Sequence, residues 1–396
     1  MKSRNFDIFC FRNEDNIAPT AADAAIEVFR TKGFFHTRRL EVQFQHRRPD
    51  LDLLRLIFFL MVFVAHTPRF PHLGWIMNAG GNGVCFFFLL SAFLITDLLM
   101  QEKALTRLVH VGSFLLRRSL RIFPLYFFAV VVGTALGLLI PSIHVLPQSL
   151  PWLLSLTYNF YIARHGWGLN ALGPLWSLSV EVQFYLAIPW IVKFGGRRVL
   201  GMLAVACFPA SYGTLLSLGR AHAVPGSQVW VNSIVQFQFF AAGILLALYF
   251  HTQSWNISIL RRGCLLTAGG ALLTAGQRAV HLHGVMPLTA SRLCCGYLLI
   301  LLSGIMLFLS LFNWPLPIHR SLLYLGRISY GLYVYHTFFL LLLVYRVEGR
   351  SPWQLLLFDV ISLGLTILTA IASYEYFERP FLRLKQRIAI QGNIIG

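Results

Sequence analysis

Charged residues are scarce in this sequence. Asp, Glu, Lys and Arg make up 12% of its 396 residues, and hydrophobic residues make up 57%, whereas an average soluble domain is about 25% charged. A soluble domain has too little interior to bury so many apolar side chains. The composition therefore indicates a polytopic membrane protein, in which each span needs about 20 mostly apolar residues.

Other absences narrow the functional classes. The six cysteines lack zinc-type spacing, and all but Cys10 fall in or beside apolar segments. His281 and His283 alone are too few ligands for a metal ion, so no metal is predicted. The net charge of +18 comes without a soluble nucleic-acid-binding module. No nucleic-acid partner is predicted, and the charge placement indicates membrane topology instead.

Ten apolar segments predict an all-α, polytopic transmembrane helix bundle. A shorter stretch, 149–163, is ambiguous. If it is an outer interfacial or re-entrant segment, the basic clusters all fall on one side, as the positive-inside rule requires. We therefore expect ten spans, with both termini cytoplasmic. The spans are 53–68, 82–100, 121–140, 176–194, 199–218, 230–250, 264–280, 293–312, 321–345 and 355–376.

The composition divides the chain into three zones. Residues 1–49 are a polar, basic extension that is expected in the cytoplasm, residues 50–381 are the membrane domain, and residues 382–396 are a short cytoplasmic tail. Arginines just before the first span fit an anchor on anionic membrane lipid, and an unstructured extension without a role is the alternative. These are Arg38, Arg39, Arg47 and Arg48.

Two polar residues share one face of the first span. Arg55 and His66 are eleven residues apart, which is about three helical turns, or about 16 Å along the axis. A guanidinium inside a bilayer is costly and usually faces a polar cavity or pathway. The alternative is that both side chains extend to the membrane interfaces.

Six sequence strings occur in the order typical of one membrane family. The chain resembles the acyltransferase-3 family of integral membrane acyltransferases, which modify bacterial surface and secreted glycans. The resemblance runs from about Asp50 to Phe381, although Ala92 stands where the family usually has glycine. The strings are Asp52-x-x-Arg55 with His66, residues 80–96, residues 117–126, residues 176–185, residues 325–336 and residues 378–381.

The resemblance implies a site for acyl-coenzyme A on the cytoplasmic side. Guanidiniums form charge-assisted, often bidentate contacts with phosphates, and the family assigns that role to the cluster Arg117, Arg118 and Arg121. Leu120 stands where the family often has another arginine, so Arg118 and Arg121 rank first. Arg55 is expected to contact the pantetheine or the phosphates. Ordinary positive-inside anchoring is the alternative for the cluster.

His66 is the predicted general base for a sugar hydroxyl, because a neutral imidazole is the usual group for that step. Glu181, expected at the same depth in another helix, is a candidate to orient His66 or to contact the substrate, and a structural hydrogen bond is its alternative. Ser91 has no partner base nearby in sequence, so it is not favoured as a nucleophile. His336 is more typical of a hydrogen-bonded core histidine.

For these residues, the resemblance implies a membrane O-acyltransferase of the bacterial inner membrane. It would move an acetyl or similar short acyl group, such as succinyl, from acetyl-CoA or another acyl-CoA to a hydroxyl of a surface or secreted glycan or lipo-oligosaccharide. Exopolysaccharide, O-antigen and a nodulation factor are candidate acceptors. A transporter or flippase of a lipid-linked or acylated glycan is the alternative. Transporters often show internal repeats, and none is evident here, which favours the enzyme.

Overall fold

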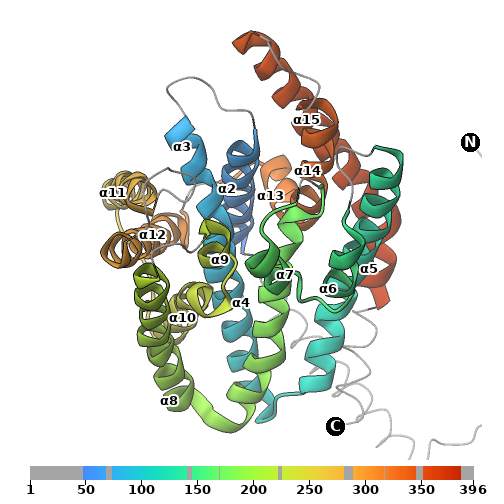
Figure 1. Ribbon diagram of the computed structural model, residues 1–396. Helices are drawn as coiled ribbons and strands as arrows, with labels where there is room; N and C mark the ends of the chain where they lie inside the picture. The colour runs from blue at the N-terminus through green and yellow to red at the C-terminus, as the bar shows by residue number, and fades with distance from the viewer. Residues whose placement is uncertain are drawn as a thin grey trace, which may run out of the picture. The chain divides into compact units, whose positions relative to one another are not determined.

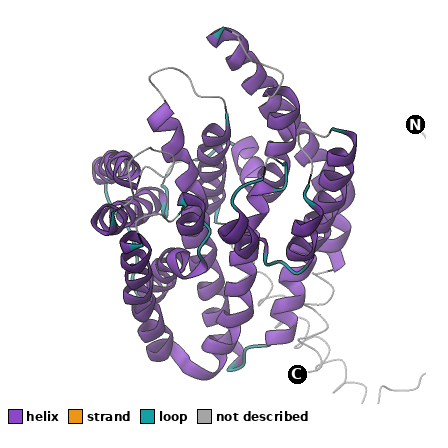
Figure 2. Ribbon diagram, viewed as in Figure 1, coloured by secondary structure: helices purple, strands orange, loops and turns teal. Residues whose placement is uncertain are grey.

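The computed structural model describes residues 48–67, 74–140, 145–168, 170–221, 225–280, 289–315, 317–344 and 351–384. Residues Arg48–Gly396 form one compact unit. All regular secondary structure within the described ranges is helical, as Figures 1 and 2 show, which confirms the all-α prediction. The predicted extension 1–49 and tail 382–396 lie almost entirely outside the described residues.

Within the described ranges, nine long helices build the unit, and shorter helices connect them. The long helices are α2 (Pro49–His66), α4 (Gly83–Thr106), α5 (Val111–Leu139), α8 (Trp176–Arg220), α10 (Ser233–Phe250), α11 (Ile259–Val280), α12 (Ala290–Leu311), α14 (Ser329–Val344) and α15 (Pro352–Ala372). The shorter ones are α3 (Gly74–Ala79), η1 (Gly80–Asn82), η3 (Pro147–Ser149), α6 (Leu150–Leu154), α7 (Tyr158–His165), η4 (Gly173–Leu175), α9 (Gly226–Trp230), α13 (Arg320–Arg327) and the π-turn η5 (Ser373–Glu378).

All ten expected spans contain helix, but their boundaries differ from the prediction. Segments 176–194 and 199–218 are two halves of α8, which bends at Gly196, where φ is 67°. Segment 321–345 is divided between α13 and α14. The helices α6 and α7 within 149–163 have five and eight residues, which is too short to cross a bilayer.

In the part of the chain that the structure describes, six helical stretches are long and apolar enough to cross a membrane, judged by length and composition alone. This supports a multi-pass membrane protein, while the count of ten spans and the cytoplasmic placement of the termini stay predictions. The six stretches are Met77–Thr106, Val111–Leu139, Gly173–Arg220, Gly226–Phe250, Ala290–Leu311 and Pro352–Leu384.

Side-chain caps explain where several of these helices begin. The Asn232 side chain accepts hydrogen bonds from the backbone N–H groups of Ile234 and Val235 at the start of α10. Ser351 and Gln354 form a capping box at the start of α15, where Pro352 occupies the first turn. Such caps satisfy backbone donors that have no partner within the helix.

Helix α4 packs against α2, α8 and α10 in the middle of the unit. Glycines allow this close approach: a Cβ at Gly243 of α10 would lie 2.2 Å from the carbonyl oxygen of Leu89, and a Cβ at Gly83 would lie 2.5 Å from that of Phe58. Small residues at helix interfaces let backbones come together in this way. The close packing fixes α2 beside α4, and these two helices carry several residues of the site.

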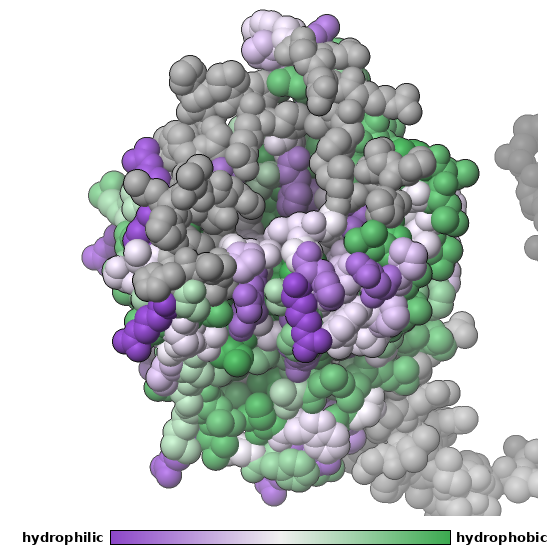
Figure 3. Space-filling view, viewed as in Figure 1, coloured by the Kyte–Doolittle hydropathy of each residue, from purple (hydrophilic) through white to green (hydrophobic). Residues whose placement is uncertain are grey.

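The surface also has the pattern of a membrane protein. In Figure 3, hydrophobic side chains cover the lower part of the view, where α8 bends, and hydrophilic side chains gather above them over α7 and α9. Exposed large hydrophobic residues on α8 include Leu186, Trp190 and Phe194, which is 75% exposed. A soluble protein rarely exposes such a continuous apolar face.

Candidate active site

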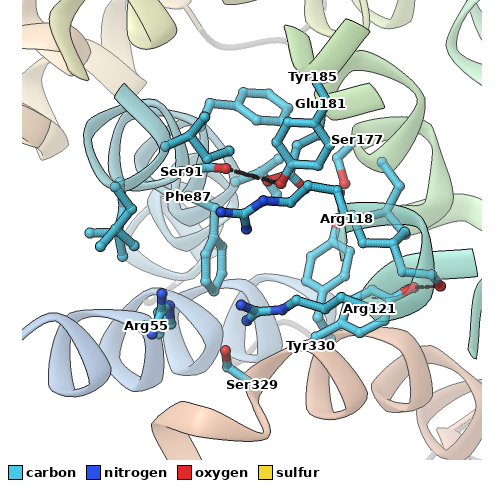
Figure 4. Close-up of a pocket in the computed structure, with 18 of the residues that line it drawn as sticks. Arg55, Phe87, Ser91, Arg118, Arg121, Ser177, Glu181, Tyr185, Ser329 and Tyr330 are labelled. Carbon is cyan, nitrogen blue, oxygen red and sulfur yellow. Dashed lines mark hydrogen bonds between the residues drawn. The ribbon is translucent and has the colours of Figure 1, made fainter. Parts of the chain in front are cut away.

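Three of the predicted arginines line one cavity. This arginine cavity, with a volume of about 310 Å³, lies between α2, α4, α5, α8 and α14. Arg55 comes from α2, and Arg118 and Arg121 come from α5 (Figure 4). In the close-up, the guanidinium of Arg121 points toward Arg55, while Arg118 extends across the cavity toward Ser91.

The charges around this cavity favour an anionic ligand. Its lining residues include three arginines and one acidic residue, Glu181. Asp52 is a second carboxylate, which accepts a hydrogen bond from Nη1 of Arg55 at 2.5 Å. Three positive and two negative charges still leave a net positive charge. Guanidiniums in this arrangement suit phosphate oxygens.

The neighbouring rings hold Arg118 in position. Its guanidinium carbon lies 5.5 Å from the ring centre of Phe114 and 5.7 Å from that of Tyr185. These are cation–π distances. Arg118 and Arg121 are three residues apart on α5, so they share a helical face.

Arg117 is not part of the cavity lining. Its Nη2 lies 3.7 Å from Oε2 of Glu102 in α4, and Glu102 also accepts a hydrogen bond from the backbone N–H of His110. One residue along a helix turns the side chain by about 100°, which directs Arg117 away from the face of Arg118. The structure thus brings together three of the four predicted donor-site arginines.

Glu181 lies in the arginine cavity, whereas His66 lines a different one. Ser91 Oγ donates to Oε1 of Glu181 at 2.5 Å, and the Tyr185 hydroxyl donates to the same oxygen. The expected contact between Glu181 and His66 is absent from the hydrogen bonds of the described residues. The carboxylate instead joins α4 to α8 beside Arg118.

His66 lines a second cavity of about 660 Å³. We call it the tryptophan cavity, because Trp167, Trp176 and Trp230 also line it. Val84 and Tyr333 line both cavities, so the two meet at these side chains. The Tyr333 hydroxyl is held by the carbonyl oxygen of Pro174 at 3.0 Å and by Ser177 Oγ at 2.8 Å.

The hydrogen bonding of His66 leaves its second ring nitrogen without a partner among the described residues. Its Nδ1 lies 2.8 Å from the carbonyl oxygen of Val62. A carbonyl oxygen only accepts, so Nδ1 carries the hydrogen and the lone pair is on Nε2. The residue is exposed at the cavity, so a ligand hydroxyl can reach Nε2. The tautomer is therefore the one a general base needs.

His336 supports His66 from the protein interior. The two ring centres are 5.0 Å apart, with an interplanar angle of 78°. His336 is fully buried, and its Nδ1 donates to the carbonyl oxygen of Tyr333 at 2.6 Å. This agrees with the expectation of a hydrogen-bonded core histidine.

Comparison with known proteins identifies the family. The model of a family described as "Acyltransferase domain" matches residues 48–375. The chain belongs to this acyltransferase family. The match confirms the resemblance found in the sequence, covers nearly the same residues and makes the protein an enzyme of acyl transfer.

Two relatives of this acyltransferase illustrate the similarity. Nodulation protein 10 of Rhizobium leguminosarum bv. viciae is 27% identical over 85% of this chain and 94% of its own length. O-acetyltransferase OatA of Staphylococcus aureus is 25% identical over 88% of this chain, but the matched region spans only 59% of OatA. No solved structure matches the chain.

Sequence reasoning missed several residues of this candidate site. Trp167 and Trp230 have no motif around them, and Tyr333 was noted only as part of a longer string. Tyr185, four residues after Glu181, stands on the same helical face, and that spacing is a signal that was available. The partnership of Ser91 and Glu181 had no local signal, because the two lie 90 residues apart.

Proposed function

We propose that this acyltransferase moves an acetyl or similar short acyl group from cytoplasmic acyl-coenzyme A to a hydroxyl of a surface or secreted glycan. The observation that carries the proposal is the pair of cavities that meet at Val84 and Tyr333. One is rich in arginine, and the other is lined by a histidine with a free basic nitrogen. The O-acetyltransferase among the relatives supports acetyl as the transferred group.

The arginine cavity is proposed to bind the donor. Arg55, Arg118 and Arg121 would contact the phosphates, while the pantetheine arm extends along α4 toward Tyr333. Donor phosphates occur in the cytoplasm, so this proposal places the arginine cavity on the cytoplasmic side of a bacterial inner membrane. The tryptophan cavity would then open to the other side and receive the acceptor.

The transfer step uses His66 as base. Nε2 takes the proton of the acceptor hydroxyl while its oxygen forms a bond to the thioester carbon. The carbon–sulfur bond then breaks, and the coenzyme A thiolate leaves and recovers a proton from the imidazolium. The products are an acyl ester and coenzyme A, so His66 returns to its starting state.

Glu181 is proposed to act on the donor side. Of the two roles expected of it, contact with the substrate fits its place in the arginine cavity better than orientation of His66. Its bond to the Tyr185 hydroxyl also holds the ring over which Arg118 lies. Glu181 would thereby help to position Arg118 as well.

Mass spectrometry of surface and secreted glycans tests the proposal. The strains are the intact strain, a deletion, and the deletion complemented with wild type or with His66→Ala at equal protein level. We expect one acyl mass to disappear in the deletion and in His66→Ala while the glycan is still exported. Loss of the whole exported glycan in the deletion would favour the transporter alternative. An acyl group retained by His66→Ala would remove His66 from the role of base.

The acceptor identity is a finer part of the proposal. The nodulation protein among the relatives keeps a secreted nodulation factor among the candidates, together with exopolysaccharide and O-antigen. The same mass spectra identify the acceptor, because the missing acyl mass is attached to a defined glycan fragment.

A further inference from the structure

The tryptophan cavity gathers three indole rings from separate parts of the chain. Trp167 precedes η4, Trp176 begins α8, and Trp230 ends α9. The ring centre of Trp176 lies 6.4 Å from that of Trp167 and 6.1 Å from that of Trp230. The Trp176 ring plane is inclined by 75° to that of Trp167 and by 58° to that of Trp230, so the three rings form an angled aromatic cluster. Trp167 is 45% exposed, which leaves a large part of its ring open to a ligand.

The rest of the described lining combines aliphatic side chains, such as Leu340 and Leu341, with polar groups. Among the described residues that line this cavity, none is Asp, Glu, Lys or Arg. The polar groups are hydroxyls and amides, such as Asn78, Ser227, Gln277 and Thr337. Gln277 accepts a hydrogen bond from Nδ2 of Asn82 through its Oε1 at 2.9 Å, which leaves its amide N–H groups as donors. The arginine cavity, by contrast, contains three guanidiniums.

This combination matches the chemistry of a neutral sugar ring. One face of a pyranose presents C–H groups, which lose contact with water when they pack on an aromatic ring. Amides and hydroxyls suit the equatorial hydroxyl groups at the edge of the sugar. A carboxylate or phosphate would lose water in this cavity without gaining a lysine or arginine partner among the described lining residues, which is unfavourable.

We propose that the tryptophan cavity selects an uncharged pyranose of the acceptor glycan, packed on the exposed ring of Trp167 within the aromatic cluster of Trp167, Trp176 and Trp230. The inference rests on the proposed function and makes it more specific. Sugars that carry a carboxylate or phosphate are excluded as the acylated residue. The hydroxyl that receives the acyl group belongs to the ring that these tryptophans hold beside His66.

Two measurements test this inference. Tandem mass spectrometry of the native glycan identifies the sugar residue that loses its acyl group in the deletion strain. We expect a neutral pyranose, and an acyl group on a uronic acid or a phosphorylated sugar would overturn the inference. The second measurement compares acylation in the deletion strain complemented with matched tryptophan variants.

Trp167 is the ring to change, because its exposure makes misfolding less of a concern than at Trp176, which is 3% exposed. We expect Trp167→Ala to reduce acylation about tenfold at limiting expression, which corresponds to the upper part of the free-energy range for a lost aromatic contact. Trp167→Tyr keeps an aromatic ring and should restore most of the acylation. Trp190→Ala is the control: Trp190 is a 47% exposed tryptophan on α8 outside the cavity lining, and its change should leave acylation unaltered.

A donor measurement separates the two proposals. Purified Trp167→Ala should bind acetyl-coenzyme A as tightly as the wild type, because the arginine cavity is intact. If the deletion removes no acyl group from any glycan, the proposed function fails. If the acyl group disappears in the deletion but Trp167→Ala acylates like Trp190→Ala, the inference fails and the proposed function stands.

Discussion

Replacing His66 by asparagine isolates its proposed chemical role from its structural one. The amide nitrogen of asparagine takes the place of Nδ1 and can still donate to the carbonyl oxygen of Val62, which lies 2.8 Å from Nδ1 in the wild type. No atom then replaces the lone pair of Nε2. General-base catalysis contributes about 100- to 10,000-fold to the rate, or about 2.7–5.5 kcal/mol. We expect His66→Asn to lose transfer by this factor.

His66→Gln provides the complementary variant. Its amide nitrogen reaches the position of Nε2 but donates a hydrogen bond instead of accepting one, so the same loss is expected. The assay measures acyl transfer from acetyl-coenzyme A to isolated glycan by purified full-length protein, with thermal unfolding and acetyl-coenzyme A binding as controls. Wild-type kcat/KM should fall as the pH decreases, because the imidazolium has no lone pair to accept a proton. If His66→Asn transfers within about fivefold of wild type, less than the usual effect of a general base, the reasoning is refuted.

Three further predictions follow from the geometry. Arg118→Ala should weaken acetyl-coenzyme A binding about 10- to 150-fold, which corresponds to the loss of one charged hydrogen bond. Arg117→Ala should change this affinity little, because Arg117 pairs with Glu102. Equal effects of the two variants in a binding titration would contradict this assignment. Ser91→Ala should keep transfer within about fivefold of wild type, since it loses the contacts of Oγ with Glu181 and the Tyr185 hydroxyl while Tyr185 still donates to Glu181, and a loss as large as that of His66→Asn would make Ser91 a nucleophile. Gly243→Ala should destabilise the protein by about 1–3 kcal/mol, because the added Cβ overpacks against Leu89. Gly270→Ala is the control, since no atom lies within 4 Å of its added Cβ. This control should unfold at the wild-type temperature or above.

Much of the fold was accessible from the sequence because each helix leaves a local pattern. The apolar runs correctly predicted helix in all ten expected segments. The helical periodicity also placed Arg55 and His66 on one face of α2 at different levels, and each of these residues lines a cavity. The boundaries were less accessible. Gly196 interrupts α8 without ending it, and Ile328 separates α13 from α14 inside one apolar run. Length and hydropathy alone identify six spanning stretches, because charges such as Asp50, Asp52 and Arg55 lower the apolar character of α2.

The sequence by itself determined the membrane class, the helical fold and the acyltransferase family, and it supplied the candidate residues of the proposed site. These depend on composition, on periodicity within one helix and on ordered strings. The tertiary structure decided which residues meet. It separated Glu181 from His66, turned Arg117 toward Glu102, and brought Trp167, Trp176 and Trp230 together. The physical reason is that a helical pattern specifies which side chains share a face, whereas the residues opposite that face depend on how distant helices pack.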